Sequence, residues 1–330
     1  MNEAIILEDV CKRFGSKVAV DNVTLQVASG GLYGFIGPNG AGKSTTIRMV
    51  MSIIFPDSGR LSVLGRASAV ESKDRIGYLP EERGVYRKMR VGAFLAHMAR
   101  LKGVDGGPAL NRKVNDWLER VGLGPEYSKK CEELSKGMQQ KVQFIACVLH
   151  QPDLLILDEP FSGLDPVNTR LMRDLFLEQH RAGVTMIFST HHMASAEALC
   201  DHIIMIHQGV KVLDAEMRDI HASHDPRRIA FRPVDDAHVA AAGRPRGVHR
   251  FDQVHQGWEA ELAPDADPVE TLREISGAIP CTRIELKRPT LEDIFVDIVT
   301  GGDFGQSADE VRAALATPDI SADNAQESAR

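Results

Sequence analysis

The sequence predicts an α/β fold whose mostly parallel sheet carries a phosphate-binding loop, and two observations support this prediction. Residues 37–45 fit the pattern G-x-x-x-x-G-K-[ST] and lie between an apolar run of strand length, 32–36, and a segment with helical periodicity. Residues 154–158 form a continuous apolar run that ends in acids, as a buried parallel strand does. Because ligands bind beyond the carboxyl ends of such strands, both features predict a phosphate site at one edge of the sheet.

The length and composition are those of a soluble globular protein. The chain has 330 residues, enough for one large domain and a smaller one, with 43% hydrophobic and 26% charged residues. It has no apolar run of about 18 residues, so we expect no membrane span, and the start Met1-Asn2-Glu3 does not predict a signal peptide. We therefore expect a cytoplasmic protein.

Charge and cysteine content exclude two further classes. The formal net charge of −7 gives no basic footprint for non-specific nucleic-acid binding, so we expect no nucleic-acid partner. The five cysteines are scattered and contain no C-x-x-C pair. We interpret them as small buried hydrophobes in a reducing compartment rather than as a disulfide framework.

The chain begins with strands that flank an aromatic residue. A strand starts at residues 5–7, and residues 23–27 alternate with period two as a second strand does. Phe14 lies between these strands and before the phosphate loop, where its ring could stack on a flat base. A lone phenylalanine is more often part of a core, so both interpretations stay open from the residues alone.

The phosphate loop has a chemical reason for each residue type in it. Its glycines let the backbone turn tightly and approach a ligand closely. Lys43 would reach the β- and γ-phosphates, and the Ser44 hydroxyl would hold Mg²⁺. The helix that follows presents its N-terminus, which favours an anion. The alternative is a plain glycine-rich turn, which the flanking strand and helix argue against. The predicted nucleotide-contacting residues are Gly37, Pro38, Asn39, Gly40, Ala41, Gly42, Lys43, Ser44 and Thr45.

Two features follow in the middle of the chain. Residues 75–82 read as a short strand that ends in Pro80 and a carboxylate pair, Glu81 and Glu82. A helical region then extends to about residue 150, with a turn-rich break at 103–108. Ser135 precedes a further helix and suits its N-cap, so a simple capped helix is the ordinary interpretation of that segment.

The strand at 154–158 ends in a possible catalytic pair. Asp158 can hold Mg²⁺, as a Walker-B acid does, and Glu159 can polarise an attacking water. Two acids at a strand end can also be a solvated turn, but a phosphate loop in the same chain favours the catalytic interpretation. After a turn at 162–166 and a helix, a strand at 184–188 leads to His191, which could touch a γ-phosphate or a water. We interpret the neighbouring His192 as an ordinary loop residue.

The last third of the chain has a different composition. Four strands (228–232, 248–254, 258–262 and 281–286) and two helices (235–242 and 268–275) are predicted in the order β-α-β-β-α-β of a ferredoxin-like unit. A last helix is predicted at 291–299. No catalytic constellation occurs in this part. From residue 301 to 330 the chain is rich in Ala, Ser and Asp, and we expect a disordered tail.

Over about residues 3–220 the chain resembles the ATP-binding subunit of ATP-binding-cassette (ABC) transporters. The family's elements occur in the family's order, here at Phe14, 37–45, Glu81, the signature at 134–138, Asp158–Glu159, the turn at 162–165, and His191. The resemblance implies an α/β P-loop NTPase core of the ABC type, with an antiparallel β lobe and a helical subdomain inserted at about 86–150. It also implies that two copies sandwich ATP and Mg²⁺, with Ser135 and Gly137 of one copy facing the phosphate loop of the other.

Two departures from the commonest family pattern narrow the resemblance. The strand-end loop has Glu81 where the family usually has Gln, and the signature reads Leu-Ser-Lys-Gly-Met rather than Leu-Ser-Gly-Gly-Gln. Both departures resemble the branch that drives ABC-2-type exporters, including sodium and drug-resistance exporters. The segment 289–295 resembles the C-terminal extension of that branch. Glu81 keeps an oxygen for a metal but adds a negative charge, so the expected metal ligands are Ser44, Asp158 and Glu81.

These observations predict a domain order and a function. We expect an ATP-binding domain at 1–220, a small α+β accessory domain at 221–300, and the tail at 301–330. The predicted function is hydrolysis of MgATP by a homodimer, with Glu159 and His191 in catalysis, to drive a separate permease from the inner face of the membrane. The alternative is a soluble ABC-type ATPase acting on ribosomes or nucleic acid, which predicts two cassettes, a coiled coil or a basic surface. A small-molecule kinase would not need the signature.

Overall fold

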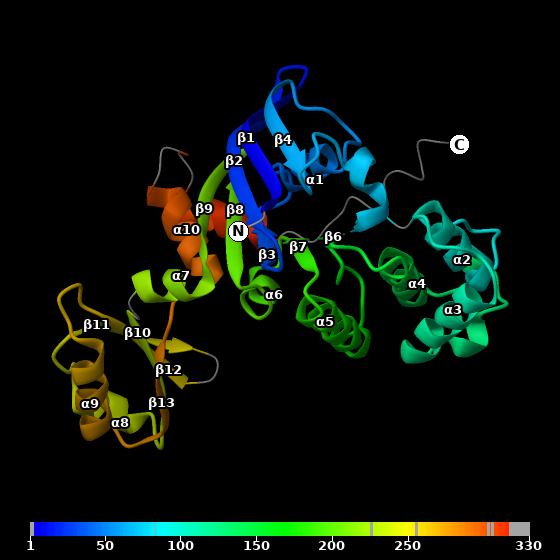
Figure 1. Cartoon of the computed structure of the whole chain (residues 1–330). Coiled ribbons are helices and arrows are strands. Elements are labelled where there is room, and N and C mark those ends of the chain that lie inside the picture. The colour runs from blue at the N-terminus through cyan, green and yellow to red at the C-terminus, as the bar shows by residue number, and fades with distance from the viewer. Residues whose placement is uncertain are drawn as a thin grey trace, which may run out of the picture. The chain divides into compact units, whose positions relative to one another are not determined.

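The computed structural model describes residues 3–82, 84–224, 227–254, 257–301, 304 and 307–316 (Figure 1). The chain divides into two compact units, one of Met1–Glu216 with Val296–Arg330 and one of Met217–Phe295. Helix α10 (Leu291–Gly301) begins in the second unit and ends in the first. The sequence-based boundaries were 220/221 and 300/301, so the compact unit begins four residues before the predicted accessory domain and ends five residues before that domain does.

The first unit is built on a sheet of six described strands in the order β5-β6-β7-β3-β8-β9. The neighbours from β5 to β8 are parallel, and β9 pairs antiparallel with β8. Every residue of the three central strands β3, β6 and β7 is buried, which explains their continuous apolar sequences. The predicted α/β core is confirmed. The strands are β3 (Leu32–Ile36), β5 (Ile76–Leu79), β6 (Leu154–Asp158), β7 (Thr185–Thr190), β8 (His202–His207) and β9 (Val210–Glu216).

The predicted antiparallel β lobe is also confirmed. It consists of β1 (Glu3–Phe14), β2 (Lys17–Ala28) and β4 (Ser58–Val63), in the order β2-β1-β4. The buried positions of β2 alternate, as its sequence predicts, because one face of the lobe packs on the core. Helix α1 (Lys43–Val50) lies beside this core, and its Ile47, Met49 and Val50 are buried.

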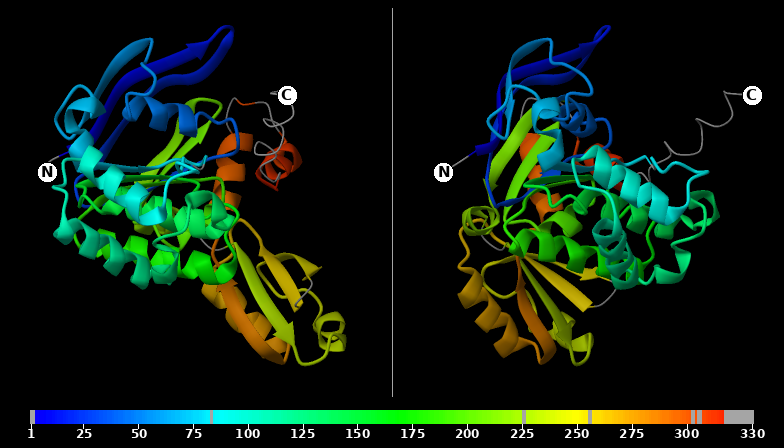
Figure 2. Two further views of the ribbon diagram at one scale, coloured as in Figure 1. Left: turned by 90° about the vertical axis from the view of Figure 1, so that its right-hand side faces the viewer. Right: turned by 45° about the vertical axis from the view of Figure 1, so that its right-hand side comes forward.

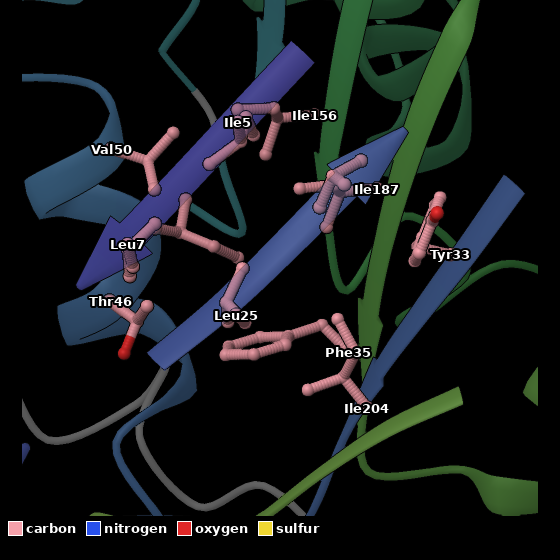
Figure 3. A pocket seen from close by; sticks show the side chains of 12 residues that line it. Ile5, Leu7, Leu25, Tyr33, Phe35, Thr46, Val50, Ile156, Ile187 and Ile204 are labelled. Carbon is pink, nitrogen blue, oxygen red and sulfur yellow. The ribbon is translucent and has the colours of Figure 1, made fainter. Parts of the chain in front are cut away.

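The core between the lobe and the sheet holds a small apolar cavity of about 20 Å³ (Figure 3). Ile5, Leu7 and Leu25 contribute to it from the lobe, and Ile156 and Ile187 contribute from the sheet. The cavity has room for about one water and no polar surface to bind it. It therefore belongs to the core and is not a candidate ligand site.

A helical subdomain is inserted between β5 and β6, as predicted. Figure 2 shows its helices on one side of the unit, and Cys147 of α4 lies against Gly77 of the edge strand β5. The subdomain packs through fully buried side chains, among them Phe94, Leu118 and Phe144. Its elements are α2 (Val91–Leu101), α3 (Pro108–Arg120), the 3₁₀ turns η2 (Gly124–Glu126) and η3 (Cys131–Glu133), and α4 (Lys136–Val148).

Three further helical elements of the first unit connect its strands. Helix α5 is the longest of them and begins at an N-cap, Asp165, whose carboxylate accepts hydrogen bonds from two backbone N–H groups at 3.0 Å. Each of the other two is a short connection next to a strand. They are η1 (Ala69–Arg75), α5 (Pro166–Arg181) and α6 (Met193–Glu197).

The second unit has the predicted β-α-β-β-α-β order. Among its described residues the strands form an antiparallel sheet in the order β11-β12-β10-β13. Its core includes Ile229, Phe231, Ala260 and Ile275. Helix α7 (Met217–Ser223) precedes this motif. The strands are β10 (Arg228–Pro233), β11 (Val248–Val254), β12 (Gly257–Leu262) and β13 (Cys281–Lys287), and the helices are α8 (Ala237–Ala242) and α9 (Pro268–Ala278).

The C-terminal segment differs from the expected disordered tail. Residues Ala308–Ala316 form helix α11, and Val311 in that helix is buried. The ring of Phe304 packs edge-on against the ring of His207, with ring centroids 5.0 Å apart. Part of the segment therefore packs on the first unit. The expectation for residues 317–330 lies outside the described residues.

Candidate functional site

The phosphate loop connects β3 to α1, and two of its glycines lie against the backbone of neighbouring segments. A Cβ atom at Gly37 would lie 2.1 Å from the carbonyl oxygen of Ile206, and one at Gly42 would lie 2.5 Å from that of Ala19. Both glycines also have positive φ, 154° and 111°. No side chain fits at either position, so glycine is required there by contact as well as by conformation.

Lys43 lies inside the loop that precedes it. Its Nζ donates hydrogen bonds to the carbonyl oxygens of Gly37, at 2.7 Å, and Pro38, at 3.1 Å. The side chain is buried, which is unusual for lysine unless it is paired or has a ligand. The loop thus holds a fixed positive charge at the N-terminus of α1, in the arrangement that binds a polyphosphate.

A cavity of about 350 Å³ opens over this loop. It joins three features that the sequence predicted separately: the loop, the aromatic Phe14 and the acids Glu81 and Glu159. Phe14 is 52% exposed, so the alternative that it is a core residue is wrong. The lining residues are Phe14, Lys17, Ala19, Asn39, Gly40, Gly42, Lys43, Ser44, Thr45, Glu81 and Glu159.

Asp158 ends β6 and is buried beside the loop. Its Oδ1 has no hydrogen-bond partner among the described residues. Burial raises the pKa of Asp158, and so does the charge of Glu159, while the nearby Ser189 and Ser44 hydroxyls and the Lys43 ammonium oppose the rise. A buried carboxylate oxygen without a partner, next to a serine hydroxyl, fits a hard divalent cation such as Mg²⁺.

Glu159 is held in one orientation by three donors. Its Oε1 accepts the backbone N–H of His191 at 2.8 Å and lies 2.7 Å from His191 Nδ1. Its Oε2 accepts the Thr190 hydroxyl at 3.0 Å. The residue also has a positive φ of 46°, which is strained for a side chain with a Cβ. Glu159 and His191, predicted from separate strands, are therefore in direct contact at adjacent strand ends. His192 is exposed, consistent with its assignment as a loop residue.

Ser135 and Gly137 lie outside this cavity. Ser135 accepts the N–H of Met138 at 3.3 Å and caps α4, as the capped-helix interpretation predicts. Gly137 faces Leu164 and Asn168, at the turn that leads into α5. Within one chain, therefore, the structure does not bring the signature residues to the phosphate loop.

Lys17 and Ala19 line the cavity but were not predicted. Both follow the turn Gly15–Ser16, which reverses the chain so that β2 returns alongside Phe14. The signal in the sequence was the glycine turn next to the aromatic residue. In a hairpin the residues after the turn pair with those before it, so Lys17 lies beside Phe14 at the same cavity.

Residues 20–162 match the family described as ABC transporter, and residues 216–299 match the family described as ATP-binding protein DrrA1-3-like, C-terminal domain. The first match contains the phosphate loop, the signature and the acid pair. The second corresponds closely to the compact unit of Met217–Phe295. Among the described residues, no helix is long and apolar enough to cross a membrane.

Individual ATP-binding proteins of ABC transporters match this chain over longer stretches than the family models do. The chain is 37% identical over 295 residues to the uncharacterized ABC transporter ATP-binding protein YhaQ of Bacillus subtilis, covering 89% of this chain and 98% of YhaQ. It is 32% identical over 313 residues to the bacitracin transport ATP-binding protein BcrA of Bacillus licheniformis, covering 92% of this chain and 100% of BcrA. A solved ATP-binding subunit of an ABC transporter is 29% identical and has a TM-score of 0.62, covering 67% of this chain and 92% of that structure.

Proposed function

Because the chain belongs to the ABC transporter ATP-binding family, we propose that it binds and hydrolyses MgATP to drive a separate membrane permease. The observation that supports this most strongly is the single cavity over the phosphate loop, which Phe14, Lys43 and Glu159 all line. An ATP molecule needs an aromatic contact for its base, a cationic cradle for its phosphates and a base for the attacking water. All three are present within one cavity of suitable chemistry.

The roles follow from the contacts of each side chain. The amides of residues 37–45 and the Lys43 ammonium stabilise phosphate charge that develops during transfer. Glu159 accepts the proton of the attacking water, since its carboxylate is oriented and lines the cavity. His191 holds Glu159 in place and senses the γ-phosphate through that contact.

Ser44, Asp158 and Glu81 are the residues that would hold Mg²⁺. When bound, the ion neutralises charge on the β- and γ-phosphate oxygens. The buried oxygen of Asp158 that lacks a partner among the described residues supports this assignment for Asp158. Glu81 is exposed and lines the cavity, so its carboxylate can reach a ligand bound there.

The position of the signature supports a homodimer that sandwiches ATP. Ser135 and Gly137 lie outside the cavity of their own chain, so they can contact a nucleotide only if a second copy provides it. Helix α4 presents its N-terminus at Ser135, with no acidic residue in its first turn to oppose an anion. Binding of ATP would then close two copies, and hydrolysis would release them.

Export is the transport direction that the resemblance to the ABC-2-type exporter branch implies. The similarity to the bacitracin transport protein BcrA extends over nearly the whole of both chains and includes the C-terminal unit. We therefore propose an exporter ATPase that is cytoplasmic and attaches to the inner face of the membrane through its permease.

Two measurements on the purified chain test this function. The first is phosphate release from MgATP by the unmodified chain and by Lys43→Ala, with Glu178→Gln as a control on an exposed acid outside the cavity. The unmodified chain and the control should hydrolyse MgATP, and Lys43→Ala should not. Absence of hydrolysis and of MgATP binding by the unmodified chain would contradict the proposal.

The second measurement is the oligomeric state of Glu159→Gln by light scattering. This variant should bind MgATP without hydrolysing it. The chain should be mostly monomeric without nucleotide and should shift to a dimer at saturating MgATP. An unchanged monomer would contradict the sandwich but not ATP binding itself.

The permease partner needs a separate experiment. A tagged chain should co-purify with a membrane protein from detergent-solubilised membranes, and that protein should stimulate its ATPase activity.

A further inference from the structure

The tip of the β1–β2 hairpin carries Phe14 beyond the end of its sheet. Strand β1 pairs with β4 only as far as Cys11, which is opposite Ser58. Residues 12–14 extend past this point, with β2 as their neighbour on one side only. The pairing with β2 is itself irregular here, with register shifts between Val10 and Lys12 and between Lys12 and Arg13. The two strands alone therefore hold this tip less firmly than the rest of the lobe.

Asp57 occupies the edge of β1 that β4 leaves unpaired. Its backbone N–H donates to the carbonyl oxygen of Cys11 at 2.9 Å. Its Oδ2 accepts the backbone N–H of Arg13 at 2.7 Å, and its Oδ1 accepts Lys12 Nζ at 2.7 Å. Asp57 thus extends the hydrogen bonding along the edge of β1, first with its backbone and then with its side chain. Its carboxylate bonds both residues that precede Phe14.

The same contacts reach the aromatic ring. Lys12 Nζ lies 5.6 Å from the centroid of the Phe14 ring, within the range of a cation–π contact. The hydrogen bonds from Lys12 and from the Arg13 backbone hold the pKa of Asp57 below its ordinary value, so the carboxylate is charged at neutral pH. Lys12 is mostly buried between its neighbours, with 16% of its side chain exposed, whereas the Phe14 ring is exposed to the cavity.

We propose that Asp57 is a positioning residue for nucleotide binding, which fixes the Phe14 ring over the cavity through the Arg13 backbone and the Lys12 side chain. Asp57 itself does not line the cavity, so it acts on the nucleotide only through Phe14. The inference rests on the proposed ATP-binding function and adds to it a residue that determines how well the base, as opposed to the phosphates, is held.

A comparison of two ligands separates this role from damage to the phosphate loop. MgATP contacts both the loop and the base platform, whereas inorganic tripolyphosphate has no base and can contact the loop alone. Dissociation constants for both are measured by calorimetry on the full chain. Asp57→Ala should weaken MgATP binding about three- to tenfold, the effect of losing about one ordinary hydrogen bond, because Asp57 is half-exposed and acts on the ligand only through Phe14. Tripolyphosphate binding should stay within about twofold, because the hydrogen bonds of Asp57 go to residues 11–13 and not to the phosphate loop.

Three variants serve as controls for this comparison. Asp57→Asn keeps an oxygen that can accept the Arg13 N–H, so it should recover most of the MgATP affinity. In a Phe14→Ala background, Asp57→Ala should have no further effect, because the group it positions is gone. Asp153→Ala removes a similarly exposed carboxylate, paired with Arg75 at 2.6 Å, that lies outside the cavity and should change neither affinity.

Several results would overturn the inference. Equal losses of affinity for MgATP and tripolyphosphate would show that Asp57 supports the fold of the loop and not the base platform. An undiminished effect of Asp57→Ala in the Phe14→Ala background would have the same meaning. If the unmodified chain binds tripolyphosphate and MgATP equally well, no base platform exists, although the phosphate site stands. If it binds neither ligand, the proposed function itself fails.

Discussion

Glu159 Oε1 and His191 Nδ1 lie 2.7 Å apart, and both residues are buried at the ends of neighbouring strands, β6 and β7. The backbone N–H of His191 donates to the same carboxylate oxygen. A carboxylate held in this way keeps a fixed orientation toward the cavity that it lines. The proposed base and the proposed γ-phosphate sensor are therefore in direct contact, so a displacement of His191 by the nucleotide would also displace Glu159.

Glu159→Gln should lower MgATP hydrolysis by at least about a hundredfold, because an amide cannot take the proton of the attacking water. Its remaining oxygen can still accept one of the present hydrogen bonds, so the fold and the affinity for MgATP should be kept. Phosphate release measures the rate, and equilibrium binding of MgATP measures the affinity. Glu178→Gln is the matched control on an exposed acid. Hydrolysis by Glu159→Gln within a few-fold of the unmodified rate would contradict the assignment of the base.

Much of the fold and of the site was predictable because the signals are local. The phosphate loop, the strand ending in Asp158 and Glu159, and the β-α-β-β-α-β order of the last third are each encoded in a short stretch. The contact between Glu159 and His191 was not predictable, because it depends on the register in which β6 and β7 pair. The role of Asp57 depends likewise on where β4 stops pairing with β1.

Residues 304 and 308–316 of the expected tail show the opposite case. Its Ala-rich, acidic composition indicates disorder when it is averaged over the segment. The structure instead depends on a few apolar side chains, Phe304 and Val311, which pack on the first unit. Composition cannot reveal such single anchors, because their effect requires a partner surface elsewhere in the chain.

The stability of the protein should fall on acidification because of His150, next to the edge strand β5. His150 Nε2 lies 3.1 Å from the carbonyl oxygen of Ile76, to which Lys102 Nζ also donates at 2.9 Å. Since that oxygen can only accept, Nε2 carries the proton, and His150 Nδ1 is buried with no hydrogen-bond partner among the described residues. Burial, followed by the charge of Lys102, lowers the pKa of His150 from 6.5 to about 4.

The lowered pKa of His150 makes the folded protein less stable at low pH. Between pH 6.5 and 4 the unfolded chain binds a proton at His150 more readily than the folded chain, so stability is lost as the pH falls through this window. The loss from pH 7.5 to pH 5 should be about 1–2 kcal/mol. In thermal melts, His150→Gln should flatten this dependence, and His249→Gln, an exposed histidine, should not. Equal slopes for His150→Gln and the unmodified chain would show that other groups cause the acid sensitivity.

Glu81 should act through its oxygen and not through its charge. It lines the cavity with Lys43 and Ser44, at the loop where the family usually has Gln. If Glu81 is a Mg²⁺ ligand, Glu81→Gln should keep most of the hydrolysis, because an amide oxygen can still coordinate. Glu81→Ala should raise the Mg²⁺ concentration needed for half-maximal hydrolysis by at least about tenfold, because even the loss of a partner that only orients a ligand costs about 10–100-fold in metal affinity.

The neighbouring Glu82 is also exposed but does not line the cavity, so Glu82→Ala is the matched control for Glu81→Ala. Hydrolysis is titrated with Mg²⁺ for all three variants. If Glu81→Ala matches the unmodified chain in both maximal rate and Mg²⁺ dependence, Glu81 is a solvated loop acid and the metal assignment there is wrong.

The C-terminal segment should support the phosphate loop through His207. The Phe304 ring contacts the buried His207 at the end of β8. The end of β8 and the turn after it touch the loop directly, since Ile206 O lies against Gly37 and Gly209 N–H donates to the carbonyl oxygen of Ala41 at 2.8 Å. Phe304→Ala should therefore lower the free energy of unfolding by about 1–2 kcal/mol, less than for a fully buried ring, and the melting temperature by roughly 2–8 °C.

Two truncations separate this contact from the rest of the tail. A chain that ends after Ala316 keeps both Phe304 and Val311, so its melting temperature and MgATP affinity should match those of the full chain. A chain that ends after Gly301 loses both anchors and should melt several degrees lower. Because MgATP binds the folded state and contacts the loop beside β8, saturating MgATP should recover part of this loss. If the chain ending at Gly301 has the same melting temperature as the full chain, the Phe304–His207 contact contributes nothing to stability and the tail is dispensable for this unit.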